Sequence, residues 1–427
     1  MKRKNDAYYI ELLQRELTSA LGCTEPGALA YAAASVVQVL GSFPRRIRVK
    51  CSGNIIKNVK GVFVPNSGGL RGVEAAVILG AVIGDPAGKL NVLEKATEED
   101  RVKTRSLLDS DFCICRLQEG EDNLYIDLTA DGEEDSARVV LKKSHTNIVR
   151  IEKNGEVKLQ REDESSCETM KNSDVLRIED ILYFADQGDI EPLKELLENQ
   201  IQANCAIAQE GLDHSYGACV GRTLLETEGS QVRVRAAAKA AAGSDARMGG
   251  SCMPVVINSG SGNQGITVTV PVVEYASELQ LSREKLHRAL VLSNLVAIHL
   301  KQYIGKLSAF CGAVSAACGS GAAITYMYGG GIDEISATIV NTLANVGGIV
   351  CDGAKASCAA KIASALDAAI LAHNMALRCR TFQAGEGFVA GDIETTIANM
   401  GYIGREGMKT TDVEILTLML KNRVPAN

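Results

Sequence analysis

Four cysteines stand in two matched frames near the C-terminal end of the chain. CGAVSAAC runs from Cys311 to Cys318 and CDGAKASC from Cys351 to Cys358, so the cysteines of each frame are seven residues apart. On one helix, residues at this spacing share a face but lie about 10 Å apart along the axis, too far for both to bind one zinc ion. An iron–sulfur cluster is wider and accepts thiolates from separate segments. The alternative is that these cysteines are small packing residues in Ala-rich helices.

Length, composition and net charge limit the possible domain number and the possible binding partners of the protein. The chain has 427 residues, of which 46% are hydrophobic and 4% aromatic, with 41 glycines and no tryptophan. This length suggests two or three domains, and the many small residues suggest closely packed helices. The net charge of −7 argues against nucleic acid or an anionic membrane surface as a partner. We find no charge-free apolar stretch of about 18 residues, so no membrane span is expected.

The cysteine content indicates a reducing compartment. The chain has 13 cysteines, and its first segment, MKRKNDAYYIELLQREL, lacks the apolar core of a signal peptide. We therefore expect a cytoplasmic protein without a disulfide framework. Its cysteines are then either ligands or small buried hydrophobic residues.

The N-terminal cysteine lies between two predicted helices. Apolar residues at helical spacing predict a first helix that includes residues 10–21, and Gly22 ends it. Thr24 with Pro26 can start the next helix. Cys23 is therefore expected in a tight turn, with its side chain near a helix N-terminus.

The remaining pattern predicts an α+β fold. Residues 45–65 alternate like strands around an Asn-rich turn, and residues 65–84 read as a Gly-rich loop leading into an apolar helix. Short β-branched strands follow between about residues 90 and 180, and the chain beyond them is helical and rich in Ala and Gly. We predict a mainly α-helical catalytic domain with an inserted smaller α+β domain. The helical domain comprises residues 1–86 and 181–427, and the insertion comprises residues 87–180.

Five motifs together carry a resemblance to a known family. In chain order they are GCTEPGALAYAAA, VPNSGGLRG, NSGSGNQG, AFCGAVSAACGSGAAITYMYGG and GGIVCDGAKASCAAKIASALDAAILAHNMAL. The combination resembles the L-cysteine desulfidase family and, more distantly, the α region of bacterial iron–sulfur L-serine dehydratases. The resemblance covers essentially the whole chain, with its motifs concentrated at residues 20–85 and 250–375. It implies a 4Fe-4S cluster, no pyridoxal phosphate, and conversion of L-cysteine to pyruvate, ammonia and sulfide.

The resemblance also implies a set of cluster ligands. Cys23 in GCTEP, Cys311 in FCGAV and Cys351 in VCDGAK match the family's ligands. In the dehydratases a cysteine shortly after the CD motif is a further ligand; Cys358 is its nearest counterpart, but at a shorter spacing, so its role stays open. Cys318 is expected to be a packing residue. Three protein thiolates leave one iron of the cluster open, and this iron can act as a Lewis acid on a substrate thiolate.

Two Gly-rich loops offer donors for a substrate carboxylate. Their backbone amides could form an anion-binding nest, and the alternative is that each is an ordinary turn. The predicted substrate-binding residues are Ser259, Ser261, Asn263 and Gln264 in NSGSGNQG, and Asn66 and Ser67 in PNSGG.

The general base is left open by the sequence. The candidates are Glu25, Lys355 and Ser67. His373 is also plausible, although a structural role suits it equally well. Arg247 in GSDARMGG could hold a carboxylate through its guanidinium fork or form a structural ion pair.

Three functions are compatible with these residues. The first is a lyase that releases hydrogen sulfide from L-cysteine, and the second is an iron–sulfur dehydratase of L-serine or a related amino acid. The third is a non-enzymatic iron–sulfur redox sensor. The absence of a recognisable DNA-reading element and the polar Ser/Asn/Gly loops favour an enzyme with a small amino-acid substrate. A homodimer is left open.

Overall fold

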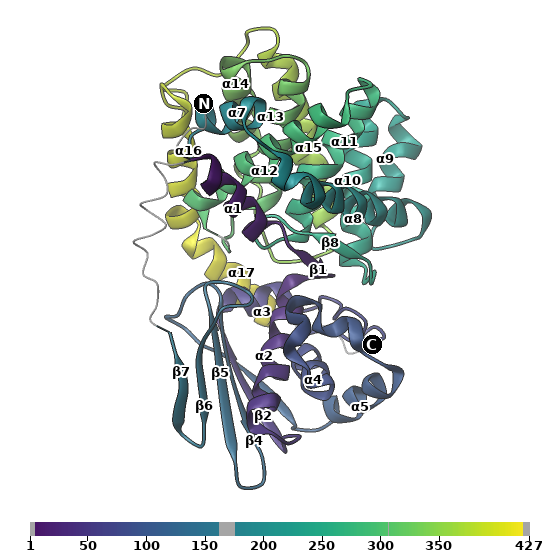
Figure 1. The fold of residues 1–427 in the computed structure, drawn as a ribbon, viewed down its shortest axis with the longest axis vertical. Coiled ribbons are helices and arrows are strands. Elements are labelled where there is room, and N and C mark those ends of the chain that lie inside the picture. Colours follow the sequence, from purple (N-terminus) through teal and green to yellow (C-terminus); the bar gives the residue numbers. More distant parts are fainter. Residues whose placement is uncertain (1–4, 162–175, 306, 422–427) are drawn as a thin grey trace.

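The protein, described by a computed structural model over residues 5–161, 176–305 and 307–421, folds into two lobes (Figure 1). One lobe is helical, and the other contains a β-sheet with helices packed against it. The predicted fold class, a mainly helical α+β protein, is confirmed.

The helical lobe is built around α13 (Gly312–Met327). Every residue of this helix from Ala313 to Met327 is buried, because its Ala, Gly and Ser side chains allow neighbouring helices to approach closely. Helices α11, α12, α14 and α15 pack against it. The helices of this lobe are α1 (Asp6–Glu16), α7 (Ile178–Gln187), α8 (Lys194–Asp213), α9 (Val220–Glu228), α10 (Val232–Met248), α11 (Gly262–Glu278), α12 (Arg283–Ile304), α14 (Ile332–Val346), α15 (Cys358–Ala376) and α16 (Ile393–Tyr402), with a short 3₁₀ turn η2 (Glu191–Leu193).

Two short strands also belong to the helical lobe. β1 (Ser19–Leu21) pairs antiparallel with β8 (Pro254–Val256). This pairing brings the segment before Cys23 next to the segment before residue 258, so two of the predicted site regions are held side by side by backbone hydrogen bonds.

Within the residues that the structure describes, the sheet lobe contains six strands in the order β3-β2-β4-β5-β6-β7, and among these strands only the β2–β3 pair is parallel. The strands are β2 (Arg46–Cys51), β3 (Cys113–Leu117), β4 (Tyr125–Asp131), β5 (Ser136–Lys142), β6 (Ile148–Lys153) and β7 (Glu156–Gln160).

Helices cover this sheet and connect it to the helical lobe. α2 packs on β4, β5 and β6, and α4 packs on β3. α17, near the C-terminal end of the chain, returns to pack against α3. The helices are α2 (Thr24–Leu40), α3 (Gly53–Val59), α4 (Val73–Ile83), α5 (Glu98–Leu108) and α17 (Lys409–Lys421), with a 3₁₀ segment η1 (Pro86–Lys95) and a π-helical turn η3 (Ile403–Gly407).

Three details differ from the sequence-based predictions. The sheet is not confined to the insertion at residues 87–180, because β2 lies between β3 and β4 and α2 packs on the sheet. Residues 53–59 form a helix instead of a strand and turn, since Ile55, Ile56 and Val59 are buried at helical spacing. The first helix ends at Glu16, and Leu21 instead lies in β1. In each case a distant segment provides the packing that decides the local structure.

No single helix of the described residues is long and apolar enough to span a membrane. α4 and η1 reach that length and apolar character only together, and a bend of 108° separates them.

Candidate functional site

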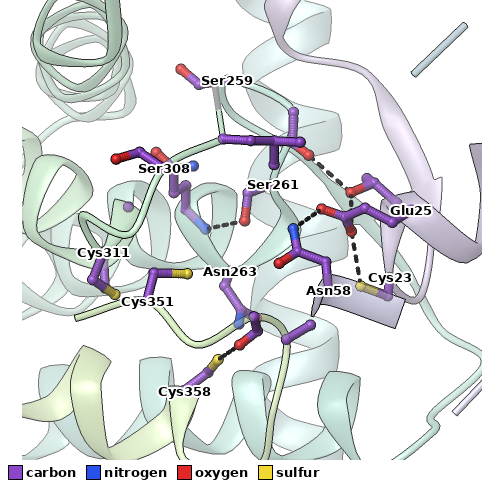
Figure 2. Close-up of a pocket in the computed structure, with 18 of the residues that line it drawn as sticks. Cys23, Glu25, Asn58, Ser259, Ser261, Asn263, Ser308, Cys311, Cys351 and Cys358 are labelled. Carbon is purple, nitrogen blue, oxygen red and sulfur yellow. Dashed lines mark hydrogen bonds between the residues drawn. The ribbon is translucent and has the colours of Figure 1, made fainter. Parts of the chain in front are cut away.

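Four cysteines line a single cavity where the two lobes meet. They are Cys23, Cys311, Cys351 and Cys358, and the cavity has a volume of about 790 Å³ including its open mouth. Figure 2 shows Cys311 and Cys351 close together, with Cys23 on the other side of Asn58. The sequence predicts one site for Cys23, Cys311 and Cys351 and leaves the role of Cys358 open, and the structure brings all four to one cavity.

Each cysteine is positioned by the start of a helix or by a loop. Cys23 is the N-cap of α2, Cys311 is the N-cap of α13, and Cys358 is the first residue of α15. Cys318, by contrast, is fully buried inside α13. The two matched frames are therefore not equivalent: the first starts at a helix cap, and the second crosses a loop into a helix.

Backbone pairing holds the two cysteine loops together. Cys311 N–H donates to the carbonyl of Ile349 at 3.1 Å, and Cys351 N–H donates to the carbonyl of Ala309 at 2.6 Å. The turn after Cys351 requires glycine: Gly353 has φ of +91°, and a Cβ there would lie 2.5 Å from the carbonyl oxygen of Lys57. This explains the glycine of the CDGAK motif.

Burial favours the neutral form of these thiols. It raises the pKa of Cys311 to about 12, and the neighbouring Cys351 adds to the shift. The pKa of Cys23 is raised by burial and by Glu25, and that of Cys358 is raised by burial although the Lys355 amide opposes the shift. Helix N-termini favour thiolates, and binding to a metal deprotonates a coordinating thiol.

The carboxylate of Glu25 lines this cavity and is held by three hydrogen bonds. Its Oε2 accepts from Cys23 Sγ and from Thr24 Oγ1, both at 3.1 Å, and its Oε1 accepts from Asn58 Nδ2 at 2.9 Å. His145 Nε2 lies 3.9 Å from Oε1. Burial opposes ionisation, but His145, Cys23 and Asn58 together hold the pKa of Glu25 below its usual value. Glu25, a predicted base, is thus an ionised carboxylate between a cysteine and a histidine.

Lys355 makes a different set of contacts. Its Nζ donates to the carbonyl oxygens of Lys57 at 3.2 Å, of Lys60 at 3.0 Å and of Ala354 at 3.2 Å. Burial lowers its pKa, whereas Cys23 and Asp352 raise it. Three carbonyl acceptors occupy the three N–H groups of an ammonium, so this environment favours a role in attaching the cysteine loop to α3 over a role as base.

The loop NSGSGNQG lines the cavity with four predicted residues. They are Ser259, Ser261, Asn263 and Gln264. Ser261 is the N-cap of α11, and its Oγ accepts from the backbone of Gln264 at 3.5 Å. Asn263 Oδ1 accepts from Arg247 Nη1 at 3.1 Å, while Arg247 Nε donates to the carbonyl of Gly22 at 2.9 Å. The buried guanidinium of Arg247 therefore connects this loop to the turn before Cys23 and lines the cavity.

The loop PNSGG is placed elsewhere. Neither Asn66 nor Ser67 is among the described residues that line the cysteine cavity. Asn66 Nδ2 donates to the carbonyls of Leu93 and Glu94, and its Oδ1 accepts from Arg101 Nη2 at 2.5 Å. Ser67 Oγ accepts from the backbone of Leu70 at 2.9 Å. These side chains hold a turn, and the structure does not bring them to the cavity.

His373 also lies apart from the cavity lining described above. Its Nδ1 is 3.0 Å from Thr325 Oγ1 inside the helical lobe. Burial, together with Arg378, lowers its pKa to about 4. This is the environment of a neutral, structural histidine.

The sequence analysis missed polar residues that complete the cavity. They are Asn54 and Asn58 on α3, His145 in the turn between β5 and β6, Lys301 at the end of α12, and Ser308. His145 is one of only 5 histidines and lies in the polar turn KKSHTN. Such a histidine was a usable signal, whereas the asparagines of α3 had none.

The chemistry of the donor set fits an iron–sulfur cluster better than a single ion. Among the described residues, no group of three or more His, Cys, Asp or Glu side chains is arranged to hold one metal ion. A four-iron cluster is wider, and its protein ligands are thiolates from separate segments. Four thiols from three segments, around Cys23, Cys311 and Cys351–Cys358, line one cavity and are consistent with that requirement.

Comparison with known proteins gives consistent matches. Residues 87–417 match the family model described as serine dehydratase alpha chain. A UPF0597 protein of Lachnoclostridium phytofermentans is 51% identical over 411 residues, which cover 96% of this chain and 99% of that protein. UPF0597 proteins of Desulfitobacterium hafniense and Finegoldia magna are each 48% identical, over 98% and 97% of this chain and 98% and 99% of their own lengths. The family match begins after Cys23 and Glu25, so their assignment depends on the motif around Cys23 and on the cavity geometry.

Proposed function

The chain belongs to the serine dehydratase alpha chain family, and from this premise we propose that it is an iron–sulfur lyase that converts L-cysteine to pyruvate, ammonia and hydrogen sulfide. The observation that supports this most directly is the convergence of four thiols on a cavity lined by small polar side chains. Dehydration of L-serine at the same site is the second candidate, because the matching family model is a serine dehydratase.

Cys23, Cys311 and Cys351 are the proposed ligands of a 4Fe-4S cluster, and Cys358 is a neighbour or a fourth ligand. A cluster held by these thiolates would supply Lewis acidity toward the β-substituent of the substrate. The pairing of the loops at Phe310 and Val350 keeps Cys311 and Cys351 adjacent, so two of the proposed ligands are preorganised.

The substrate carboxylate is assigned to the positive side of the cavity. Arg247 is buried there and already donates to Asn263. The N-terminus of α11 begins at Ser261 and adds the partial positive charge of a helix end. A guanidinium can bind a carboxylate with two parallel hydrogen bonds, which would hold the α-carbon in a defined orientation.

Removal of the α-proton is assigned to His145, with Glu25 as its partner. The His145 imidazole and the Glu25 carboxylate are 3.9 Å apart, and a carboxylate beside a histidine stabilises the imidazolium that forms on proton transfer. The electrons of the C–H bond then form a carbon–carbon double bond while the carbon–sulfur bond breaks and sulfide leaves. The released enamine becomes an imine and reacts with water to give pyruvate and ammonia.

The test is analysis of protein that was purified without oxygen. We expect iron and acid-labile sulfide at one cluster per chain, and pyruvate formation with L-cysteine exceeding that with L-serine under identical conditions. Faster turnover of L-serine would replace the first candidate by the second. Full iron content with no pyruvate from either amino acid would contradict both and favour a redox protein.

A further inference from the structure

Three buried amide oxygens face the cysteine cavity without hydrogen-bond partners. They are Asn54 Oδ1, Asn58 Oδ1 and Gln264 Oε1, which have no partner among the described residues although all three residues line the cavity. A buried acceptor left without a donor costs about 1–3 kcal/mol. Several such atoms around one cavity indicate a ligand that brings several N–H or O–H donors.

The orientation of the two asparagines is determined by their neighbours. Asn58 Nδ2 donates to Glu25 at 2.9 Å, and Asn54 Nδ2 lies 3.5 Å from Asp412 Oδ2. A carboxylate only accepts hydrogen bonds, so the amide nitrogen must face it and the amide oxygen faces away. Asn54 and Asn58 are four residues apart on α3 and therefore share one face. Figure 2 shows the oxygen of Asn58 turned toward the middle of the cavity.

Gln264 comes from the opposite lobe, in the first turn of α11. Its side chain packs against Gly312, where a Cβ would lie 2.8 Å from Nε2. Gln264 is 4% exposed, so its amide is confined by packing. Its oxygen adds a third acceptor to those of α3.

We propose that these three oxygens form the subsite for the α-ammonium group of the substrate. An ammonium has three N–H donors and no acceptor, so it can satisfy three carbonyl-type oxygens at once. The carboxylate of Glu25, hydrogen-bonded to Asn58, adds attraction for a cation. The subsite accordingly selects primary amino acids over 2-hydroxy acids and simple carboxylates. This inference rests on the proposed function, because it treats the ammonium ligand as the substrate of that reaction. The expectation that an ammonium group binds here comes from the three amide oxygens alone.

The test measures binding without turnover. L-Alanine has the ammonium and carboxylate but no leaving group, and propionate lacks only the ammonium. Titration calorimetry of the anaerobic, full-length protein gives the affinity for each. The variants are Gln264→Met, which keeps the length of the side chain, and Asn58→Leu. Asn91→Leu is the matched control, because Asn91 Oδ1 is also buried without a partner among the described residues but does not line this cavity.

We expect Gln264→Met and Asn58→Leu each to weaken L-alanine binding by about ten- to a hundredfold, the range for a lost hydrogen bond to a charged group, and to leave propionate binding unchanged. Asn91→Leu should change neither affinity. Equal losses for both ligands, or no loss for L-alanine in Gln264→Met, would overturn the assignment. If the preference for L-alanine is present but neither L-cysteine nor L-serine is turned over, the proposed reaction is wrong and the ammonium subsite stands.

Discussion

Two glycine-rich loops, residues 258–265 and 65–69, have similar Asn, Ser and Gly side chains but lie in different surroundings. The first begins a long helix, and Arg247 connects it to the turn before Cys23. The second is closed by its own backbone, with Ser67 accepting from Leu70, and is held by Arg101. A loop of this composition becomes part of a cavity only when distant elements place charged and sulfur-bearing groups beside it.

The largest effect is expected when a proposed ligand is removed from the cysteine cavity that the loop 258–265 lines. Cys311→Ala should abolish iron binding and pyruvate formation together, because Cys311 lines the cavity and is a proposed ligand. Cys318→Ala is the control: it belongs to the same sequence frame but is buried inside α13, and it should retain iron and activity. Iron content and the cluster absorption spectrum report the outcome, and a full complement of iron in Cys311→Ala would be incompatible with the ligand set.

The next largest effect is expected at the histidine beside Glu25. His145→Gln should lower kcat by about 10²–10⁴-fold, the usual contribution of a general base, while the iron content is unchanged. His373→Gln is a buried control outside the cavity lining; equal losses of kcat in both variants would point to a structural effect.

A direct comparison of the two loops gives a smaller effect. Asn263→Ala should lower kcat/KM by about ten- to a hundredfold, because Asn263 holds the guanidinium assigned to the substrate carboxylate. Ser67→Ala should leave kcat/KM unchanged and lower the free energy of unfolding by about 0.5–1.5 kcal/mol, the net contribution of a typical hydrogen bond, because the Leu70 N–H loses its acceptor. Reduced turnover in Ser67→Ala with wild-type stability would restore the role in substrate binding that the sequence predicts.

The last effect leaves the site intact and concerns only the pH dependence of stability near Arg247. Asp245 lies on the same helix but faces α9, where it accepts from the backbone of Gly221 at 3.1 Å. Burial raises its pKa from 3.8 to about 6. The folded state therefore binds this proton more tightly than the unfolded state, and the resulting stability is complete below pH 3.8 and is lost as the pH rises through about 6.

Asp245→Asn keeps an acceptor for Gly221 but cannot ionise. We expect the free energy of unfolding of this variant to fall less steeply than that of the wild type between pH 4 and pH 6, by up to about 3 kcal/mol at about 1.4 kcal/mol per pKa unit. Denaturant unfolding at several pH values measures this difference. Identical slopes in the two proteins would show that Asp245 titrates normally.

Much of the fold could be predicted from local patterns. The helices that begin at Thr24 and Val73, the strand at Arg46–Cys51 and the helical C-terminal half have clear periodicity. α3 and the assignment of β2 to the sheet could not be predicted, because the same apolar residues suit a strand or a helix and the packing against α17 and β4 decides between them.

Only some residues of the candidate site could be predicted from the sequence. The cysteines and the loop 258–265 belong to recognisable motifs, and the structure gathers them in one cavity. Asn58 comes from a short helix in which nothing in the local sequence marks a polar residue as facing the cysteines. His145, in the polar turn KKSHTN, did offer a signal, but the sequence does not show that this turn reaches the cavity. Asn66 and Ser67 were predicted to bind substrate but do not line the cavity. A turn and a binding loop can have similar local sequences, and the residues that pack against them from elsewhere in the chain decide between the two.

The position of the cavity between the lobes has a consequence for the lifetime of the protein. Cys23 precedes α2 of the sheet lobe, whereas Cys311, Cys351 and Cys358 belong to the helical lobe. A group bound by cysteines of both lobes is also a cross-link between them, and its binding free energy contributes to folding. Loss of the proposed cluster would remove this cross-link, so the segments around the cavity would open more often and be cut more readily by proteases. Molecules without the proposed cluster would be degraded faster than molecules that contain it, so the cluster would also influence how long each molecule survives.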